Sequence, residues 1–256
     1  MCGRYALAAD PARLAEEFEV QEVTDEVLPP DYNVAPTRPV YVVVDRPEGS
    51  ALTSVGTGEY ERSGSADAGT QVRALMVARW GLVPTWAKDE SGASRLINAR
   101  SETVAEKPSF RAAFAKRRCL IPATGYYEWN VVDRPGDKPL KQPYYIHRAD
   151  DASLAFAGLY EWWRTASGAW LLTCALITTD ASVEVSAIHD RMPMTIEPRD
   201  WQEWLDPSAG LGEATALMVT AHDLASWPVS TRVNAVRDHG PDLLTPVPAP
   251  ERGGLF

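Results

Sequence analysis

Apolar residues in the middle of the chain follow the patterns of β-strands. Val40 to Val44 is a β-branched run, which is typical of a buried strand. The other predicted strands are at the N-terminus and over residues 74–80, 120–129, 143–147, 155–163 and 170–178. Turn residues separate neighbouring strands, because Arg134-Pro135-Gly136-Asp137 and Ser167-Gly168 both indicate hairpins. Consecutive strands joined by short turns predict a mostly antiparallel β core.

Helical spacing is confined to short segments. Asp10-Pro11 supplies a cap and a first-turn proline, and Leu14, Ala15 and Phe18 follow as an apolar stripe. Further short helices are predicted over residues 109–116, 198–205 and 212–218. The expected fold class is therefore α+β: a mostly antiparallel β core, either barrel-like or made of two packed sheets, with several short flanking helices.

The length of 256 residues, 45% of them hydrophobic, predicts one domain with a sizeable core. We expect this domain to span residues 1–245. Residues 46–71 are rich in Gly, Ser, Ala, Thr and acidic residues, which indicates a variable loop or hairpin insertion. Residues 246–256 form a Pro- and Gly-rich tail.

Composition favours a cytoplasmic protein. The chain has three cysteines without paired spacing, no apolar run of about eighteen residues and no signal-peptide pattern. Cys119 and Cys174 lie in apolar runs and are expected to be buried and unreactive. The net charge of −10 argues against indiscriminate coating of nucleic acid, but it leaves room for a local site. The basic run Lys116 to Arg118 is interpreted as a solvated helix face.

Standard catalytic signatures are absent from the sequence. It contains no phosphate-binding loop, no dinucleotide-binding glycine fingerprint and no Gly-x-Ser-x-Gly elbow. Its four histidines lack metal-ligand spacing. We therefore expect a site that uses neither a metal nor a cofactor.

The first five residues, Met1-Cys2-Gly3-Arg4-Tyr5, contain a possible N-terminal nucleophile. Removal of Met1 would leave an N-terminal cysteine, whose α-amine and thiol titrate near about 8 and about 8.5. Such a 1,2-aminothiol can condense with an aldehyde and close a thiazolidine ring. Two alternatives remain open at this point: Cys2 is an inert residue, or it is the nucleophile of an amidohydrolase, since glutamine amidotransferases also begin Met-Cys-Gly.

Three later segments place polar residues in apolar or rigid settings. Asn98 and Arg100 flank Ala99 and should project from one face as a strand ends. Glu128 lies between two aromatic residues, where withdrawal from water would raise its pKa towards the range useful for proton transfer. His189 precedes Asp190 in a segment that Pro193 would hold extended. Taken singly, Asn98 could cap a turn, Glu128 could pair with a surface arginine and His189 could bond to Asp190.

Together these segments form an ordered set of motifs. They are Met1-Cys2-Gly3-Arg4-Tyr5, Tyr32-Asn33-Val34-Ala35-Pro36, Trp80-Gly81-Leu82-Val83-Pro84, Ile97-Asn98-Ala99-Arg100-Ser101-Glu102-Thr103, Cys119-Leu120-Ile121-Pro122, Gly125-Tyr126-Tyr127-Glu128-Trp129 and Ile188-His189-Asp190-Arg191-Met192-Pro193. In content and order the chain resembles the SOS-response-associated peptidase (SRAP) family of abasic-site shielding proteins, from residue 2 to about residue 245.

The resemblance implies a covalent function. Cys2, freed of Met1, would capture the ring-opened aldehyde of an abasic site as a thiazolidine, in a reaction that can be stoichiometric. Asn98 would orient the Cys2 adduct, Glu128 would move protons, and His189 would assist sugar ring opening and reversal of the linkage. The family label also implies removal of Met1, by the protein itself or by an aminopeptidase, and the resemblance allows a weak lyase activity. A protein of this kind would associate with the nucleoid when DNA is damaged.

The implied partner is single-stranded DNA with abasic sites, bound by a monomer without metal or membrane. Arg4, Arg100 and Arg191 would hold the flanking phosphates, Asn33 would contribute to the DNA contacts, and Trp86 would stack on or wedge beside a base. Relatives can carry two consecutive tryptophans where this chain has Trp86-Ala87, which predicts a smaller wedge.

Three other functions compete with abasic-site capture. The first is an N-terminal-nucleophile cysteine amidohydrolase, which the later motifs disfavour. The second is a peptidase that acts on other proteins. The third is an adaptor that binds single-stranded DNA without chemistry.

Overall fold

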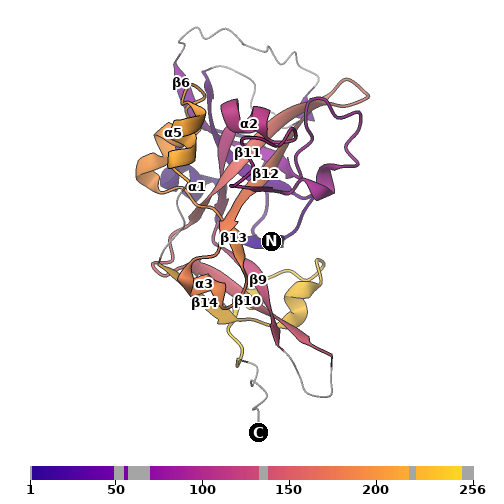
Figure 1. Cartoon of the computed structure of the whole chain (residues 1–256), viewed down its shortest axis with the longest axis vertical. Helices are drawn as coiled ribbons and strands as arrows, with labels where there is room; N and C mark the ends of the chain where they lie inside the picture. The colour runs from indigo at the N-terminus through magenta and orange to yellow at the C-terminus, as the bar shows by residue number, and fades with distance from the viewer. Residues whose placement is uncertain (1, 49–54, 57–69, 133–137, 219–222, 250–256) are drawn as a thin grey trace.

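The computed structural model describes residues 2–48, 55–56, 70–132, 138–218 and 223–249. Within these residues the chain forms two β-sheets, one of nine strands and one of five, with short helices around them. The larger sheet occupies the upper part of the molecule and the smaller sheet the lower part (Figure 1). The predicted fold class, a mostly antiparallel β core with short flanking helices in one domain, is confirmed.

Five strands of the larger sheet close into a barrel. They are β4 (Pro39–Pro47), β6 (Gln71–Trp80), β8 (Arg118–Ala123), β11 (Leu154–Arg164) and β12 (Trp170–Asp180). Neighbours around the ring are antiparallel, except that β6 and β12 pair in parallel and so close it. β4, β6 and β8 are almost continuously buried, which explains why their sequences read as apolar runs without alternation.

Four short strands extend this barrel. They are β2 (Glu22–Val23), β5 (Val55–Gly56), β7 (Asn98–Arg100) and β13 (Arg191–Pro193). β2 pairs with β6, and the other three pair with β12. β7 and β13 are therefore attached to the same barrel strand, which places Asn98 and the segment after His189 at one end of the barrel.

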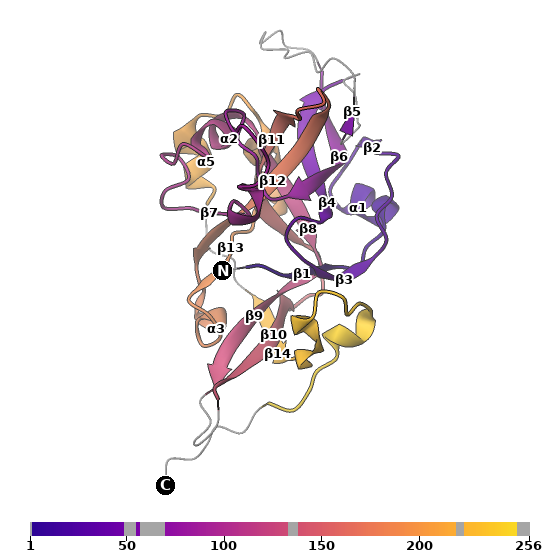
Figure 2. The ribbon, with the colours of Figure 1, turned by 90° about the vertical axis from the view of Figure 1, so that its right-hand side faces the viewer.

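The smaller sheet has the strand order β14-β10-β9-β1-β3. Its strands are β1 (Tyr5–Leu7), β3 (Asp31–Val34), β9 (Gly125–Val132), β10 (Leu140–Arg148) and β14 (Leu224–Pro228). All of its pairs are antiparallel. β1 crosses the waist of the molecule, where the two sheets meet (Figure 2).

Helices are short and pack at the sheet margins. The α-helices are α1 (Pro11–Glu17), α2 (Arg111–Lys116), α3 (Val183–Ser186), α4 (Trp201–Leu205) and α5 (Leu211–Ala216), and the 3-10 helices are η1 (Ala93–Arg95), η2 (Pro198–Asp200), η3 (Thr231–Asn234) and η4 (Pro241–Leu244). The Asp10 side chain caps α1 by accepting from Arg13 N at 2.9 Å. Within the described residues, no helix is long and apolar enough to span a membrane.

The single strand predicted over residues 120–129 is wrong, because Thr124 divides it into β8 and β9. Thr124 donates from both N and Oγ1 to Ala6 O, at 2.8 and 3.0 Å, and so anchors the break to β1. Gly125 follows, where a Cβ atom would lie 2.4 Å from the Tyr145 ring. The chain thus passes from the barrel into the smaller sheet at a point that excludes a side chain.

The solvated helix face predicted for Lys116 to Arg118 is wrong at Arg118. Arg118 is 2% exposed and begins β8. Its guanidinium donates to Phe114 O at 2.8 Å and to Trp204 O at 2.7 Å, carbonyls in the last turns of α2 and α4. Carbonyls at helix ends lack intrahelical donors, so this arginine satisfies both helices and attaches them to the barrel.

Two predicted features fall partly outside the described residues. In the 46–71 segment, residues 49–54 and 57–69 lie outside them, and Val55–Gly56 forms β5. The hairpin turn at residues 134–137 also lies outside, between paired strands β9 and β10. In the predicted tail from residue 246, Pro246 bridges to Val229 and Val247 N donates to Pro228 O at 2.9 Å, so this segment starts against β14.

Candidate active site

Cys2, Asn98, Glu128 and His189 meet where the two sheets join, and we call this group the Cys2 site. Cys2 precedes β1, Asn98 begins β7, Glu128 lies in β9, and His189 stands two residues before β13. Two of these elements belong to the smaller sheet and two to the larger one. The site therefore exists only when the two sheets are packed together.

Cys2 is held by its backbone. Its carbonyl accepts a hydrogen bond from Asn98 Nδ2 at 2.7 Å, and its thiol faces Arg4 O at 3.7 Å. Cys2 is 0% exposed. Burial raises the pKa of the thiol well above its ordinary value, and the Glu128 carboxylate raises it further. The thiol is therefore protonated at neutral pH and needs a base to become a nucleophile.

Glu128 has the properties of such a base. It is 2% exposed and lies in the first half of β9, where residues 125–128 are all buried. Burial raises its pKa to about 7, and the nearby Asp190 carboxylate acts in the same direction. A carboxylate with this pKa can accept and return a proton near neutral pH.

His189 lies next to Glu128, with Nε2 at 3.7 Å from Oε2. Its Nδ1 accepts a hydrogen bond from Arg191 N at 2.9 Å, and burial lowers the pKa of the imidazole. We therefore assign the neutral tautomer with its proton on Nε2, towards Glu128. Asp190 Oδ1 also lies 2.9 Å from Nδ1, and this contact becomes a hydrogen bond only when Nδ1 carries a proton, as in the imidazolium. The bond between His189 and Asp190 that the sequence suggested therefore belongs to the protonated ring, and the neutral ring accepts from Arg191 N instead.

Arg191 is already bound to carboxylates. Its guanidinium contacts Glu102 and Asp180, each at 2.5 Å, and donates to Thr178 O at 2.8 Å. The arginine side chain is 10% exposed, whereas those of Glu102 and Asp180 are 47% and 85% exposed. A phosphate would have to compete with both carboxylates for Arg191.

Arg4 and Asn33 form a second bonded group. Arg4 Nη1 donates to Asn33 Oδ1 and to Val233 O, both at 2.7 Å. Asn33 is 1% exposed, and its Nδ2 donates to Ala235 O at 3.1 Å and Asp238 O at 2.9 Å. In this structure the two side chains attach the segment around η3 to β1 and β3.

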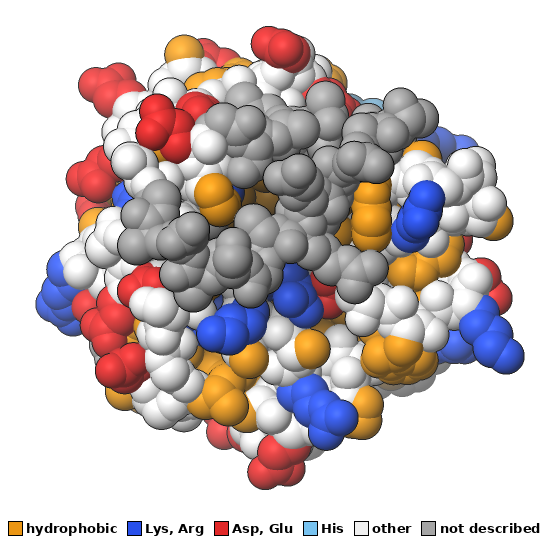
Figure 3. All heavy atoms as spheres, turned by 90° about the horizontal axis from the view of Figure 1, so that it is seen from above, with side chains coloured by type: hydrophobic (Ala, Val, Ile, Leu, Met, Phe, Trp, Pro, Cys, Tyr) orange, Lys and Arg blue, Asp and Glu red, His pale blue; other side chains and the backbone are white. Residues whose placement is uncertain are grey.

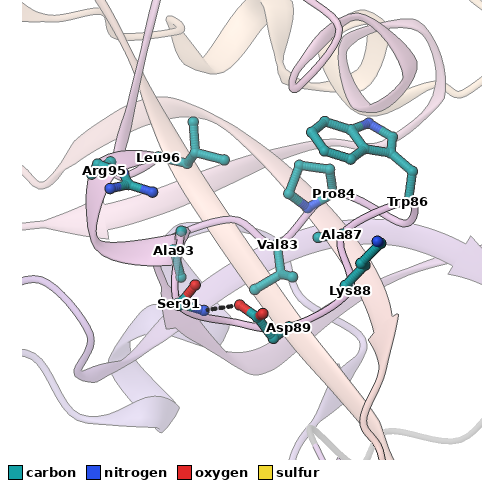
Figure 4. A pocket seen from close by; sticks show the side chains of 11 residues that line it. Val83, Pro84, Trp86, Ala87, Lys88, Asp89, Ser91, Ala93, Arg95 and Leu96 are labelled. Atoms are coloured by element: carbon teal, nitrogen blue, oxygen red, sulfur yellow. Dashed lines mark hydrogen bonds between the residues drawn. The ribbon is translucent and has the colours of Figure 1, made fainter.

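Trp86 is 64% exposed and lines a pocket of about 300 Å³. Figure 4 shows Pro84 beside the indole, Lys88 on the same side as Trp86, and Leu96 and Arg95 across the pocket; we call this the Trp86 pocket. Ala87 also lines it, and its carbonyl accepts from Trp163 Nε1 at 2.9 Å, so Ala87 fixes the loop instead of presenting a second ring. Leu96 stands two residues before Asn98, which connects the pocket to the Cys2 site along the chain.

Arg100 is the last of the predicted DNA-binding residues. It ends β7, is exposed and lies on the same strand as Asn98. Elsewhere charge is mixed: seen from the top of Figure 1, the molecule carries basic and acidic side chains close together (Figure 3). With a net charge of −10, any attraction for DNA must be local to the site.

The four predicted catalytic residues thus lie together, whereas the predicted DNA contacts are spread over bonded arginines and an exposed pocket. Sequence reasoning did not identify the carboxylates that hold Arg191 or the Tyr126 hydroxyl. Glu102 and Tyr126 lie within the sequence motifs, but a motif does not show which groups their side chains contact. In the described ranges, no group of three or more His, Cys, Asp or Glu residues could hold a metal ion.

Comparison with known families gives a clear result. The model of the family described as SOS response associated peptidase (SRAP) matches residues 1–236. The chain belongs to this family. The resemblance inferred from the motifs is confirmed.

The alignments with similar proteins cover nearly the whole of this SRAP chain. It is 35% identical to the abasic site processing protein YoqW of Bacillus subtilis over 252 residues, covering 95% of this chain and 99% of the relative. It is 33% identical to the abasic site processing protein HMCES of Gallus gallus, covering 96% of this chain and 78% of the relative. A crystal structure of a protein from Bacteroides thetaiotaomicron shares the fold, with a TM-score of 0.74, 24% identity and coverage of 96% and 100%.

Proposed function

We propose that this SRAP protein captures abasic sites in single-stranded DNA through a thiazolidine formed by Cys2 after Met1 is removed. The bond from Asn98 Nδ2 to the Cys2 carbonyl carries this proposal, because it holds the N-terminal residue beside a carboxylate whose pKa burial raises to about 7. The names of the relatives YoqW and HMCES, both abasic site processing proteins, support it.

The reaction has two bond-forming steps. The α-amine of Cys2 adds to the aldehyde carbon of the ring-opened sugar, and loss of one water molecule leaves an imine. The sulfur then adds to the imine carbon, the thiol proton is transferred to the nitrogen, and a five-membered ring closes. Glu128 accepts the thiol proton and returns it, for which a pKa near neutrality is suited.

In this proposal, His189 acts as the proton donor in opening of the sugar ring. Its neutral Nε2–H can donate to the ring oxygen as the sugar opens, and the same group can assist the reverse reaction. Because His189 and Glu128 are 3.7 Å apart, a proton can pass between them through one small movement or one water molecule.

The DNA strand lies across Arg100 and the Trp86 pocket in this proposal. An exposed indole offers a stacking surface for a base, and Arg100 offers a cation for a phosphate near Cys2. Arg191, Arg4 and Asn33 join these contacts when phosphates replace their present partners. The linkage shields the lesion, and each protein molecule acts once per lesion unless the linkage reverses.

Removal of Met1 is a prerequisite, because an acylated nitrogen cannot form the imine. Self-cleavage before Cys2, assisted by Glu128 and His189, would account for the peptidase in the family description. Weak lyase activity follows from the same imine, which acidifies the neighbouring sugar carbon and so permits strand cleavage before the ring closes.

The decisive test uses a single-stranded oligonucleotide with one abasic site. The processed protein should give a shifted band that survives heat and SDS, and Cys2→Ala or a chain with Met1 blocked should not. The matched control is Cys119→Ala, a buried cysteine outside the Cys2 site, which should keep the band. Glutamine hydrolysis that depends on Cys2, without any shifted band, would support the amidohydrolase alternative instead.

A further inference from the structure

Tyr126 is the second residue of β9 and stands beside the Cys2 site. It pairs with Tyr5 of β1 across the antiparallel register. Since side chains alternate along a strand, Tyr126 and Glu128 share one face of β9 and Tyr127 lies on the other. The ring of Tyr126 meets Phe156 edge-on, with centroids 6.0 Å apart and an angle of 77°. Its position is thus fixed by packing.

The hydroxyl of Tyr126 is buried and has no hydrogen-bond partner within the described part of the chain. The hydroxyl of Tyr5, across the strand pair, is likewise buried without a partner, whereas Tyr127 donates to Tyr32 O at 2.7 Å and Tyr41 accepts from Leu28 N at 2.7 Å. Buried polar groups are nearly always bonded, so a rigid hydroxyl without a partner indicates an interaction that forms in another state of the site.

The surroundings of this hydroxyl identify that interaction. Tyr126 and Cys2 belong to the same buried cluster, and Tyr126 interacts electrostatically with the Cys2 thiol first and with Glu128 second. Tyr5, its partner on β1, interacts chiefly with Cys174 and Asp31, and only then with Cys2. Tyr126 also stands two residues before Glu128 on the same face of β9, and for this reason we assign the role below to Tyr126 and not to Tyr5.

We propose, on the basis of the function proposed above, that the Tyr126 hydroxyl donates a hydrogen bond to the Cys2 sulfur as negative charge develops on it during ring closure. The S–H bond breaks as Glu128 takes the proton, the S–C bond forms at the imine carbon, and the imine nitrogen receives the proton that Glu128 returns. The Tyr126 proton stays on its oxygen throughout. Its role is to stabilise a thiolate that burial otherwise disfavours.

Other charged or titratable groups around the sulfur are accounted for. Glu128 of β9 opposes a thiolate by like charge, and Tyr5 of β1 interacts electrostatically with Cys174 and Asp31 more than with Cys2. His189 and Asp190 face Glu128 from the segment before β13. The Asn98 Nδ2 donor is used by the Cys2 carbonyl. Tyr126 and Tyr5 both carry hydroxyl donors without a partner in the described residues, and Tyr126 is the one that shares a face of β9 with Glu128.

The test separates imine formation from ring closure. Borohydride reduces the imine to a permanent amine link but leaves a thiazolidine unreduced, so the two species can be counted separately. Tyr126→Phe keeps the ring and removes the donor. We expect thiazolidine formation to slow by about tenfold or more, with its pH midpoint moved upwards, while the rate of borohydride-trapped imine stays at the wild-type value.

The matched control is Tyr127→Phe, the neighbouring residue on the opposite face, which loses a structural hydroxyl. It should lower the melting temperature and leave both rates and the pH midpoint unchanged. Wild-type ring closure in Tyr126→Phe, at every pH, would refute the inference while leaving the proposed function intact. A wild-type protein that forms neither imine nor thiazolidine would refute the proposed function itself.

A second variant guards against misfolding. Fluorotyrosine at position 126 keeps the ring and the hydroxyl but makes the hydroxyl more acidic. The pH midpoint of ring closure should then differ from that of the wild type. An unchanged midpoint in a folded fluorotyrosine protein also contradicts the role proposed for Tyr126.

Discussion

The Cys2 site and the Trp86 pocket are built on opposite physical principles. Cys2 is fully buried and Glu128 is 2% exposed, so their ionisation is set by the protein interior. Trp86 is 64% exposed and lines an open pocket with cationic side chains at its ends. The first region can control protons, and the second can offer a surface to a ligand.

This difference separates chemistry from affinity. Changes in the Cys2 site should alter rates at saturating DNA, because they alter the reacting groups and not the strand contacts. Changes around the Trp86 pocket and Arg100 should alter the DNA concentration needed and leave the saturated rate intact. Substitutions at four residues test this separation, beginning with the largest expected effect.

Glu128→Gln should slow crosslinking by about a hundredfold to ten-thousandfold at saturating DNA, because the base that takes the thiol proton is lost. In the wild type the rate should rise with pH around 7, where Glu128 ionises, and the variant should lose this rise. The measurement is the single-turnover rate between pH 5 and pH 9. Glu161→Gln, which changes another buried glutamate paired with Arg117 at 2.7 Å, should retain the wild-type pH profile.

The same variant should be more stable above neutral pH. Burial raises the pKa of Glu128 from 4.5 to about 7, so the folded state holds the extra proton between these values. The free energy of unfolding therefore falls as pH rises through this window, by up to about 3 kcal/mol, and glutamine removes that loss. Denaturant unfolding at pH 5 and pH 8 measures it. A wild-type protein equally stable at both values would contradict a buried carboxylate at this position.

Trp86→Ala should weaken binding of single-stranded DNA by about 1–3 kcal/mol, since a stacking surface is lost. The crosslinking rate at saturating DNA should stay near that of the wild type. Fluorescence anisotropy of an undamaged strand gives the affinity, and a quenched time course gives the rate. Leu211→Ala, which trims a 45% exposed side chain on α5, should change neither quantity.

Asn98→Ala should slow crosslinking by about tenfold, because the 2.7 Å bond that holds the Cys2 carbonyl is lost. DNA affinity should not change. Asn234→Ala is the control, since it also removes one side-chain hydrogen bond, to Trp129 Nε1 at 2.7 Å, but outside the Cys2 site. A tenfold loss of affinity with an unchanged rate would place Asn98 among the DNA contacts instead.

Arg100→Ala should have the smallest effect. We expect the slope of log affinity against log salt concentration to fall by about 1, with a loss of only a few-fold at moderate salt. Arg13→Ala, in which a 59% exposed arginine side chain is removed from α1, should leave the slope unchanged. Equal slopes for both variants would assign Arg100 a purely structural role.

Local pattern predicted much of this molecule. The Asp10 cap and the apolar stripe behind it located α1, and the apolar runs located β4, β6, β11 and β12, because short-range sequence determines these features. Asn98, Glu128 and His189 were identified from motifs and lie together with Cys2. Glu128 also has the raised pKa that its two aromatic neighbours suggested.

Long-range contacts were beyond such reasoning. The parallel pairing of β6 with β12 joins residues about a hundred positions apart, and neither strand's own sequence indicates which strand it pairs with. The break at Thr124 depends on Ala6, and the burial of Arg118 depends on carbonyls of two separate helices. The motif around Arg191 likewise did not indicate that Glu102 and Asp180 contact its guanidinium. Most of these contacts join segments that are separated in the sequence.

The burial of the Cys2 sulfur bears on how long a captured lesion would persist. A bond made at an atom with no solvent contact is out of reach of water, small thiols and repair enzymes for as long as the two sheets stay together. Its lifetime then depends on the stability of the fold as well as on the reversal that His189 would assist. Unfolding or proteolysis of the protein offers a second release step, and mechanical force on the DNA would act on the waist between the sheets before it reached the thiazolidine.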